Sequence, residues 1–83
     1  MRRSTVSVRW HEGLHLRHAA RLVEAGRRFR STIRLRYGER IADLRSIVSL
    51  VALCATMGAT LNLEVDGDDE QEAAQTVEQV FLG

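Results

Sequence analysis

Three segments of the chain alternate strictly between apolar and polar residues, and this alternation narrows the folds that it can adopt. They are Thr5–Trp10, Ser31–Tyr37 and Thr60–Asp66. Successive side chains of a β-strand point to opposite faces, so each segment predicts a strand that is buried on one face only. A two-residue turn with glycine first, at Gly38-Glu39, predicts a hairpin into a short return strand at Arg40–Ala42. The sequence therefore predicts a four-stranded sheet with one polar, open face.

Apolar residues recur at helical spacing between the first two strands. The segment Leu16–Arg27 is predicted to be an amphipathic helix. Its apolar stripe consists of Leu16, Ala19, Ala20 and Val23. A second, nearly all-apolar segment, Ile47–Cys54, predicts a short helix. Its expected core residues are Ile47, Leu50 and Cys54.

The last predicted helix begins near Asp69, which is expected to cap it. Glu72 stands three residues later and completes the pattern of a capping box. The buried stripe of this helix is predicted to consist of Ala73, Ala74, Val77, Val80 and Phe81. The order β-α-β-β-α-β-α then predicts an α+β two-layer sandwich, in which three helices cover one side of a four-stranded antiparallel sheet.

The length of 83 residues predicts one domain, residues 1–83. Cys54 is the only cysteine, so no disulfide can form within the chain, which fits a reducing compartment. The histidines and the cysteine lack the spacing of metal ligands, and we predict no metal site. No signal peptide follows the basic N-terminus, and the longest apolar run is too short to span a membrane. We expect a cytoplasmic monomer without membrane insertion.

Charge is divided unevenly along the chain. Residues 1–45 hold all 12 arginines and four acidic residues, a net charge of +8, whereas residues 46–83 carry seven acidic residues and no base, a net charge of −7. Such asymmetry predicts a basic face for an acidic partner, unless the two halves interleave in the fold.

Gly13-Leu14-His15-Leu16-Arg17 is the candidate functional motif. It places His15 just before a predicted helix, where backbone N–H groups are free and the helix dipole is positive. Arg17 adds a guanidinium in the first turn. A phosphoryl group on His15 would meet backbone donors and a cation in one place. The motif indicates a histidine that accepts a phosphoryl group and passes it on; by the residues alone, a solvated histidine or an imperfect cap is the alternative.

The chain resembles the HPr family, the histidine phosphocarriers of the bacterial phosphoenolpyruvate-dependent phosphotransferase system (PTS). The resemblance covers essentially the whole chain. It is carried by the His15 motif, by the order of predicted elements, and by two segments, Asp43-Leu44-Arg45-Ser46-Ile47 before the second helix and Gly67-Asp68-Asp69-Glu70 before the third. It implies an HPr-like open-faced sandwich and a phosphoprotein of sugar transport.

The resemblance implies a relay in which enzyme I loads His15 and an enzyme IIA domain takes the phosphoryl group from it. In the family the group is carried on the Nδ1 atom of the histidine that matches His15. Arg17 matches the arginine that neutralises the group, and the N–H groups of Leu16 and Arg17 match its backbone donors. No metal or organic cofactor is implied. We expect a protein phosphocarrier that other proteins load and unload, not a freestanding enzyme.

Ser46 matches a serine that HPr kinase/phosphorylase modifies in some bacteria of the family. By its residue type and position alone, Ser46 is predicted to be the N-cap of the second helix. The resemblance implies a regulatory phosphorylation site at the same residue.

Two positions depart from the family pattern. The family usually has proline where His18 stands and often has asparagine where Glu12 stands. We expect His18 to be exposed; the alternative is a protonated ring that stabilises a bound phosphoryl group. A carboxylate at Glu12 would repel a phosphoryl dianion if it pointed inward, so we expect it to turn to solvent or to pair with an arginine.

The second helix is the expected docking surface for partner proteins. Ile47, Val48 and Val51 are more apolar than one helix face needs, and Val48 and Val51 are the candidates for exposure. The expected basic rim of this surface consists of Arg17, Arg21 and Arg27.

Two other functions fit parts of the sequence. One is a regulatory HPr-like module, controlled through His15 and Ser46 without a role in sugar transport. The other is a nucleic-acid-binding α+β domain, suggested by arginines such as Arg34 and Arg36 on the predicted open face. That face lacks an aromatic stacking platform, so we expect no nucleic-acid partner.

Overall fold

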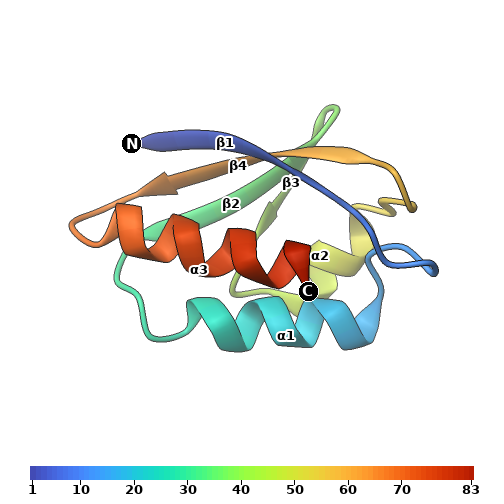
Figure 1. Cartoon of the computed structure of the whole chain (residues 1–83), viewed down its shortest axis with the longest axis horizontal. Helices are drawn as coiled ribbons and strands as arrows, with labels where there is room; N and C mark the ends of the chain where they lie inside the picture. The colour runs from blue at the N-terminus through green and yellow to red at the C-terminus, as the bar shows by residue number, and fades with distance from the viewer.

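The computed structural model describes residues 1–83 and contains a four-stranded antiparallel sheet and three helices. In chain order the elements are β1 (Arg2–Ser7), α1 (Leu16–Gly26), β2 (Thr32–Tyr37), β3 (Arg40–Asp43), α2 (Ile47–Ala52), β4 (Thr60–Asp66) and α3 (Glu70–Leu82). The strands lie in the order β1-β4-β2-β3. In Figure 1 the helices α1 and α3 lie side by side beneath the sheet, and α2 lies beside the β3 edge.

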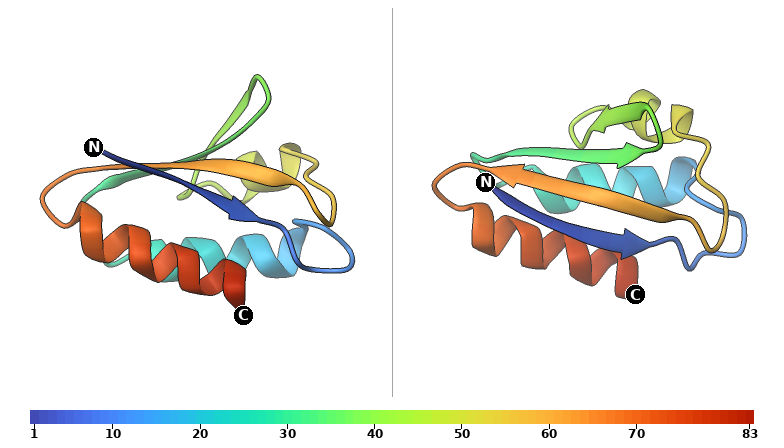
Figure 2. Two further views of the ribbon diagram at one scale, coloured as in Figure 1. Left: turned by 45° about the horizontal axis from the view of Figure 1, so that its top comes forward. Right: turned by 90° about the horizontal axis from the view of Figure 1, so that it is seen from above.

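This arrangement confirms the predicted α+β open-faced sandwich. Figure 2 shows the open face of the sheet from above, with α1 and α3 behind it. No helix has both the length and the apolar character needed to cross a membrane.

The strand β4 is central to the core because it pairs with β1 on one side and β2 on the other. Its inward residues Leu61, Leu63 and Val65 are fully buried. In the register of the sheet, Leu63 lies between Ser4 of β1 and Leu35 of β2. Strict alternation predicted β4 with its observed bounds, since this strand is covered on one face and flanked on both edges.

The first strand lies earlier in the chain than the predicted segment Thr5–Trp10. It spans Arg2–Ser7, and its last pair joins Ser7 to Thr60, the first residue of β4. Beyond this pair, the N–H of Val8 still donates to the Ala59 carbonyl over 2.9 Å, and the N–H of Gly58 donates to the Val8 carbonyl over 2.8 Å. Val8 and Trp10 are still buried, as their alternation predicted, although they lie outside the ladder.

The buried face of α1 is rotated from the predicted stripe. Leu16 is 64% exposed and Ala20 is exposed, whereas Ala19, Leu22 and His18 are buried. The preceding loop determines this rotation, because Leu14 is buried and its N–H donates to the Ala55 carbonyl over 2.9 Å. The helix begins two residues after Leu14, so the loop decides which side of its first turn faces inward.

Asp69 does not cap α3 with its side chain, and the predicted capping box with Glu72 is wrong. The Asp69 carboxylate instead accepts hydrogen bonds from the backbone N–H groups of Arg30 and Ser31, at 2.8 and 3.0 Å, and from the Ser31 hydroxyl. The Asp69 carboxylate therefore binds the connection between α1 and β2 instead of the first turn of α3. The predicted buried stripe of α3 is confirmed for Ala73, Ala74, Val77 and Phe81, and Val80 is half-buried.

Cys54 is exposed, so its predicted place in the core is wrong. The helix α2 ends at Ala52, two residues before the predicted end. Cys54 has a φ of 55°, in the left-handed region, and the chain reverses there. Leu53 is buried in its place.

Candidate functional site

The loop before α1 holds His15 through backbone contacts to distant parts of the chain. Gly13 has a φ of 82°, and a Cβ atom at this position would lie 2.6 Å from the Ala55 carbonyl oxygen. The N–H of Gly13 donates to the Trp10 carbonyl, and the N–H of Leu14 donates to Ala55. The segment that follows α2 thus supports the loop that carries His15.

His15 is the N-cap residue of α1, but its ring makes no capping hydrogen bond. The first intrahelical bond runs from the N–H of Ala19 to the His15 carbonyl over 2.9 Å. The N–H groups of Leu16 and Arg17 therefore have no acceptor within the helix, as expected at a helix start. The side chain of Arg17 is exposed in the same turn. The predicted combination of an imidazole, free backbone donors and a guanidinium is present.

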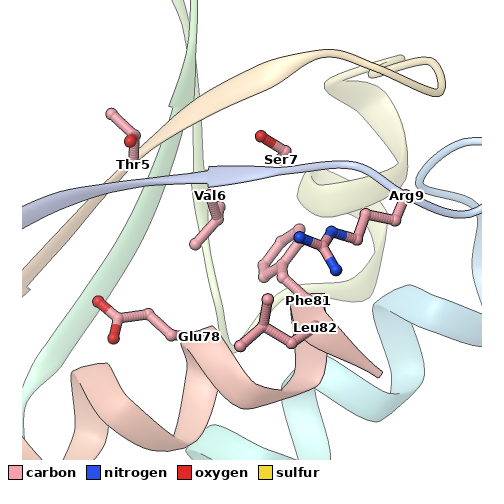
Figure 3. A pocket seen from close by; sticks show the side chains of 7 residues that line it. All are labelled: Thr5, Val6, Ser7, Arg9, Glu78, Phe81 and Leu82. Carbon is pink, nitrogen blue, oxygen red and sulfur yellow. The ribbon is translucent and has the colours of Figure 1, made fainter.

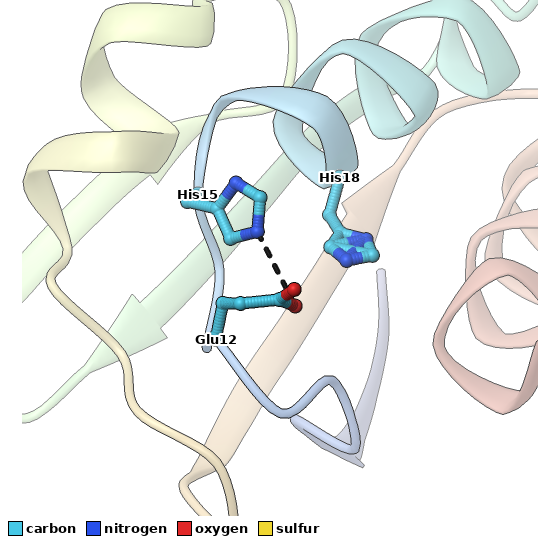
Figure 4. Close-up of side chains that lie close together, drawn as sticks. All are labelled: Glu12, His15 and His18. Atoms are coloured by element: carbon cyan, nitrogen blue, oxygen red, sulfur yellow. Dashed lines mark ion pairs between the residues drawn. The ribbon is translucent and has the colours of Figure 1, made fainter.

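Glu12, His15 and His18 form a close cluster, shown in Figure 4. The Nε2 atom of His15 lies 3.5 Å from the Glu12 carboxylate. Glu12 is 57% exposed, as expected of a carboxylate that turns to solvent, but its ionic partner is His15 and not an arginine. Its own backbone N–H and the His15 side chain lower the pKa of Glu12, which favours the ionised carboxylate.

Because His15 pairs with Glu12, its two ring nitrogen atoms have different surroundings. Nε2 is buried and faces the carboxylate, whereas Nδ1 lies on the other side of the ring (Figure 4). A carboxylate beside one imidazole nitrogen favours the tautomer with its proton on that nitrogen. The lone pair of neutral His15 is then on Nδ1, and Glu12 offsets the positive charge that the ring gains when Nδ1 forms a bond.

His18 is only 4% exposed, so the expectation of an exposed ring is wrong. Its ring stacks on Trp10, with centroids 4.0 Å apart and an angle of 7° between the planes. It meets His15 edge-on at a centroid separation of 5.0 Å. Burial lowers the pKa of His18, and the neighbouring His15 and Arg17 lower it further. Neither ring nitrogen has a hydrogen-bond partner within the protein.

Ser46 is the N-cap of α2, as predicted, and its hydroxyl accepts a hydrogen bond from the N–H of Ser49 over 3.1 Å. Val48 is 79% exposed and Val51 is also exposed, as expected, while Ile47 is half-buried. Sequence patterning missed Leu16, which was assigned to the core and is exposed in the first turn of α1.

The arginines of the predicted rim lie at different distances from the site. Arg17 and Arg21 are exposed on the first half of α1. Arg27 follows the far end of the helix, about 18 Å from His15 along the axis at 1.5 Å per residue, and it pairs with Glu24 at 3.4 Å. The structure therefore does not bring Arg27 together with His15.

The hollow in Figure 3 lies between β1 and α3, away from the histidine cluster. Its volume is about 390 Å³, and its lining includes the side chains of Arg9 and Phe81. No residue of the Glu12–His15–His18 cluster lines it. The candidate site is thus an exposed loop and helix start, a shape that suits a protein partner better than an enclosed small molecule.

The amino-acid sequence matches the family described as "PTS HPr component phosphorylation site" over residues 2–82. The chain belongs to the HPr family. The phosphocarrier protein HPr of Cupriavidus necator is 41% identical over 61 residues, which are 74% of this chain and 68% of that protein. The HPr of Treponema pallidum is 38% identical over 77 residues, 93% of this chain and 88% of that protein.

Solved HPr structures have the same fold. HPr-C-His from Thermoanaerobacter tengcongensis superposes with a TM-score of 0.93 at 28% identity, over 99% of this chain and 92% of that one. The family membership agrees with the phosphocarrier function that the motif around His15 indicated, and it makes this chain an HPr phosphocarrier of the PTS.

Proposed function

We propose that His15 carries the phosphoryl group of this HPr phosphocarrier, that enzyme I loads it, and that an enzyme IIA domain unloads it. The observation that carries this proposal is that the two ring nitrogens of His15 have different surroundings. Nε2 lies against Glu12, and Nδ1 is free beside the start of α1. The Nδ1 lone pair forms the new P–N bond while the bond between phosphorus and the donor's leaving atom breaks in line. Unloading reverses these roles on the acceptor's histidine.

The surroundings of His15 suit a carrier that holds the group only moderately. The N–H groups of Leu16 and Arg17 and the Arg17 guanidinium offer donors and positive charge to the phosphoryl oxygens. Glu12 stabilises the positive ring on the opposite side from Nδ1. Because the site is exposed, water weakens each of these interactions, so the group is retained without a large loss of transfer potential.

Phosphotransfer with purified enzyme I and phosphoenolpyruvate tests this proposal. The wild-type chain should gain the mass of one phosphoryl group, and His15→Ala should gain none. His11→Ala is the matched control, because His11 is an exposed loop histidine outside the cluster, and it should be loaded normally. Undiminished loading of His15→Ala would refute the assignment.

The exposed apolar residues Leu16, Val48 and Val51 form the proposed docking surface, with Arg17 and Arg21 as its basic rim. These residues come from the first turn of α1 and from α2, and the Leu14–Ala55 hydrogen bond joins the two regions. We expect Val48→Asp to raise the concentration of this protein needed for half-maximal transfer about tenfold, since an exposed apolar anchor at an interface contributes more than about 1 kcal/mol. Ile41→Asp, at an apolar residue 50% exposed on β3, should leave that concentration unchanged.

Ser46 is the proposed regulatory phosphorylation site, modified by a kinase of the HPr kinase/phosphorylase type. A phosphate there would lie at the start of α2, beside the docking surface, and would repel an acidic partner. Ser46→Asp and Ser46→Asn both keep a good N-cap residue but differ in charge. Loading by enzyme I should slow in the Asp variant alone; equal rates in the two variants would exclude an electrostatic effect at this position.

A further inference from the structure

We propose that Glu12, His15 and His18 form a binding site for a divalent transition-metal ion of the Zn²⁺ type. The sequence prediction of no metal site considered only the histidines and the cysteine. It left out Glu12, which stands three residues before His15, as His18 stands three residues after it. Their candidate ligand atoms all lie within 4.8 Å of one another. Two imidazoles and one carboxylate are a common protein ligand set for Zn²⁺, with water in the fourth position.

Three ring nitrogens of this cluster are buried and make no hydrogen bonds, which distinguishes the cluster from a chance grouping of polar residues. His18 is almost fully buried, yet neither of its ring nitrogens has a partner within the protein. The buried Nε2 of His15 has only the Glu12 carboxylate near it, at 3.5 Å, and makes no hydrogen bond. Buried polar nitrogens are normally satisfied, because leaving one unpaired costs about 1–3 kcal/mol. A metal ion would satisfy one nitrogen of each ring at once.

The distances require only small side-chain movements. Ligand atoms about 2.1 Å from a tetrahedral zinc ion lie about 3.4 Å apart, and the His15–Glu12 contact is already 3.5 Å. His18 is fixed by its stacking on Trp10, so it provides a rigid ligand. Glu12 and His15 are 57% and 39% exposed in their side chains and can rotate toward it.

Metal binding at this cluster would interrupt phosphoryl transfer, a consequence that rests on the proposed function of His15. When Nε2 of a neutral imidazole coordinates a metal, the ring proton resides on Nδ1. The Nδ1 lone pair is then unavailable to phosphorus. The family usually has proline where His18 stands, so we expect this property to depend on the residue at position 18.

Equilibrium dialysis and calorimetry of the whole chain with Zn²⁺ test the site directly. We expect one ion per chain, with at least about tenfold weaker binding in His18→Phe and in Glu12→Gln, because each loses a ligand. His18→Phe keeps an aromatic ring against Trp10, and Glu12 is exposed, so at least the second variant should fold as the wild type does. His11→Ala and Cys54→Ser remove the remaining histidine and the cysteine of the chain, and neither should weaken binding.

Zinc binding that survives both His18→Phe and Glu12→Gln, or that disappears in His11→Ala or Cys54→Ser, would overturn the site. Loading by enzyme I then separates the two proposals. Zn²⁺ should inhibit loading of the wild-type chain at concentrations that leave loading of His18→Phe unaffected. If the metal-free wild-type chain is never loaded, the proposed function fails, but the dialysis result still decides the metal site.

Discussion

At the scale of single residues, Gly13 has a large effect on the loop that carries His15. It combines a positive φ with a backbone oxygen 2.6 Å from where a Cβ atom would lie. Each of these features alone disfavours a side chain, the first by strain and the second by a clash with backbone that cannot easily move. Glycine at this position allows the loop to pack against the segment after α2.

Gly13→Ala should therefore lower the free energy of unfolding by about 1–3 kcal/mol, from backbone strain and the clash together. Urea unfolding followed by circular dichroism measures the change. Gly58→Ala is the matched control, since Gly58 also has a positive φ, 91°, but no atom lies near its missing Cβ. A loss for Gly13→Ala no larger than that for Gly58→Ala would show that the contact with Ala55 is unimportant.

At the scale of secondary-structure elements, the end of α2 shows why a continuous apolar run is a poor guide to helix length. The run continues through Cys54, but the helix ends at Ala52 and the chain turns at Cys54 with a left-handed backbone. Helices often end in this conformation, which glycine adopts without cost. Here a cysteine adopts it, and its side chain is left in solvent.

Replacing Cys54 with glycine should stabilise the fold by about 0.5–1 kcal/mol. Relief of about 1–2 kcal/mol of left-handed strain exceeds the added chain entropy of glycine in the unfolded state. A gain of this size raises the melting temperature by a few degrees in a domain of this length. Cys54→Ser keeps a side chain at the same φ and should leave the melting temperature unchanged. If Cys54→Gly were no more stable than Cys54→Ser, the backbone at this position would not be strained.

At the scale of the whole molecule, the fold mixes the basic and acidic halves of the sequence. The acidic segment β4 lies between β1 and β2, and Glu64 is paired in register with Arg3 on one side and Arg34 on the other. Its carboxylate also lies 3.4 Å from Arg36. The open face is therefore not a continuous basic surface, which weakens the nucleic-acid alternative.

Asp69 is a second long-range link, because it joins the start of α3 to the connection between α1 and β2. The Ser31 hydroxyl, together with the N–H groups of Arg30 and Ser31, lowers the pKa of Asp69 below its ordinary value of 3.8. A carboxyl group whose pKa is lower in the folded chain stabilises the fold above 3.8, and this contribution is lost as pH falls through the folded pKa.

Asp69→Asn should accordingly reduce the melting temperature at neutral pH and make it depend less on pH between about 5 and 2. Thermal unfolding across that range measures both effects. Asp68→Asn alters the exposed neighbouring residue, which makes no side-chain hydrogen bond within the protein, and should follow the wild-type curve. Parallel curves for wild type and Asp69→Asn would contradict the assigned role.

The sequence by itself was sufficient to predict the order of elements, the strands β2 and β4, the N-cap at Ser46 and the position of His15 at a helix start. Each of these depends on residues near one another in the chain, through alternation, capping or turn geometry. For β1 the sequence predicted which residues are buried but not the bounds of the strand. Exposure of Val48 and Val51 was predictable too, because α2 carries more apolar residues than its one buried face can hold.

The tertiary structure alone decided the orientation of α1, the partner of Asp69 and the surroundings of His15. Packing of Leu14 against the segment after α2 turns His18 inward and Leu16 outward. Polarity alone would predict the opposite, with the leucine buried and the histidine exposed. Stacking on Trp10 then holds His18 beside His15, and the loop brings Glu12 to the same ring. Local pattern cannot predict the contacts of Leu14 and Asp69, because they depend on how segments distant in sequence pack around a shared core. Glu12, His15 and His18 stand three residues apart, so for them the fold decided only the directions of the side chains.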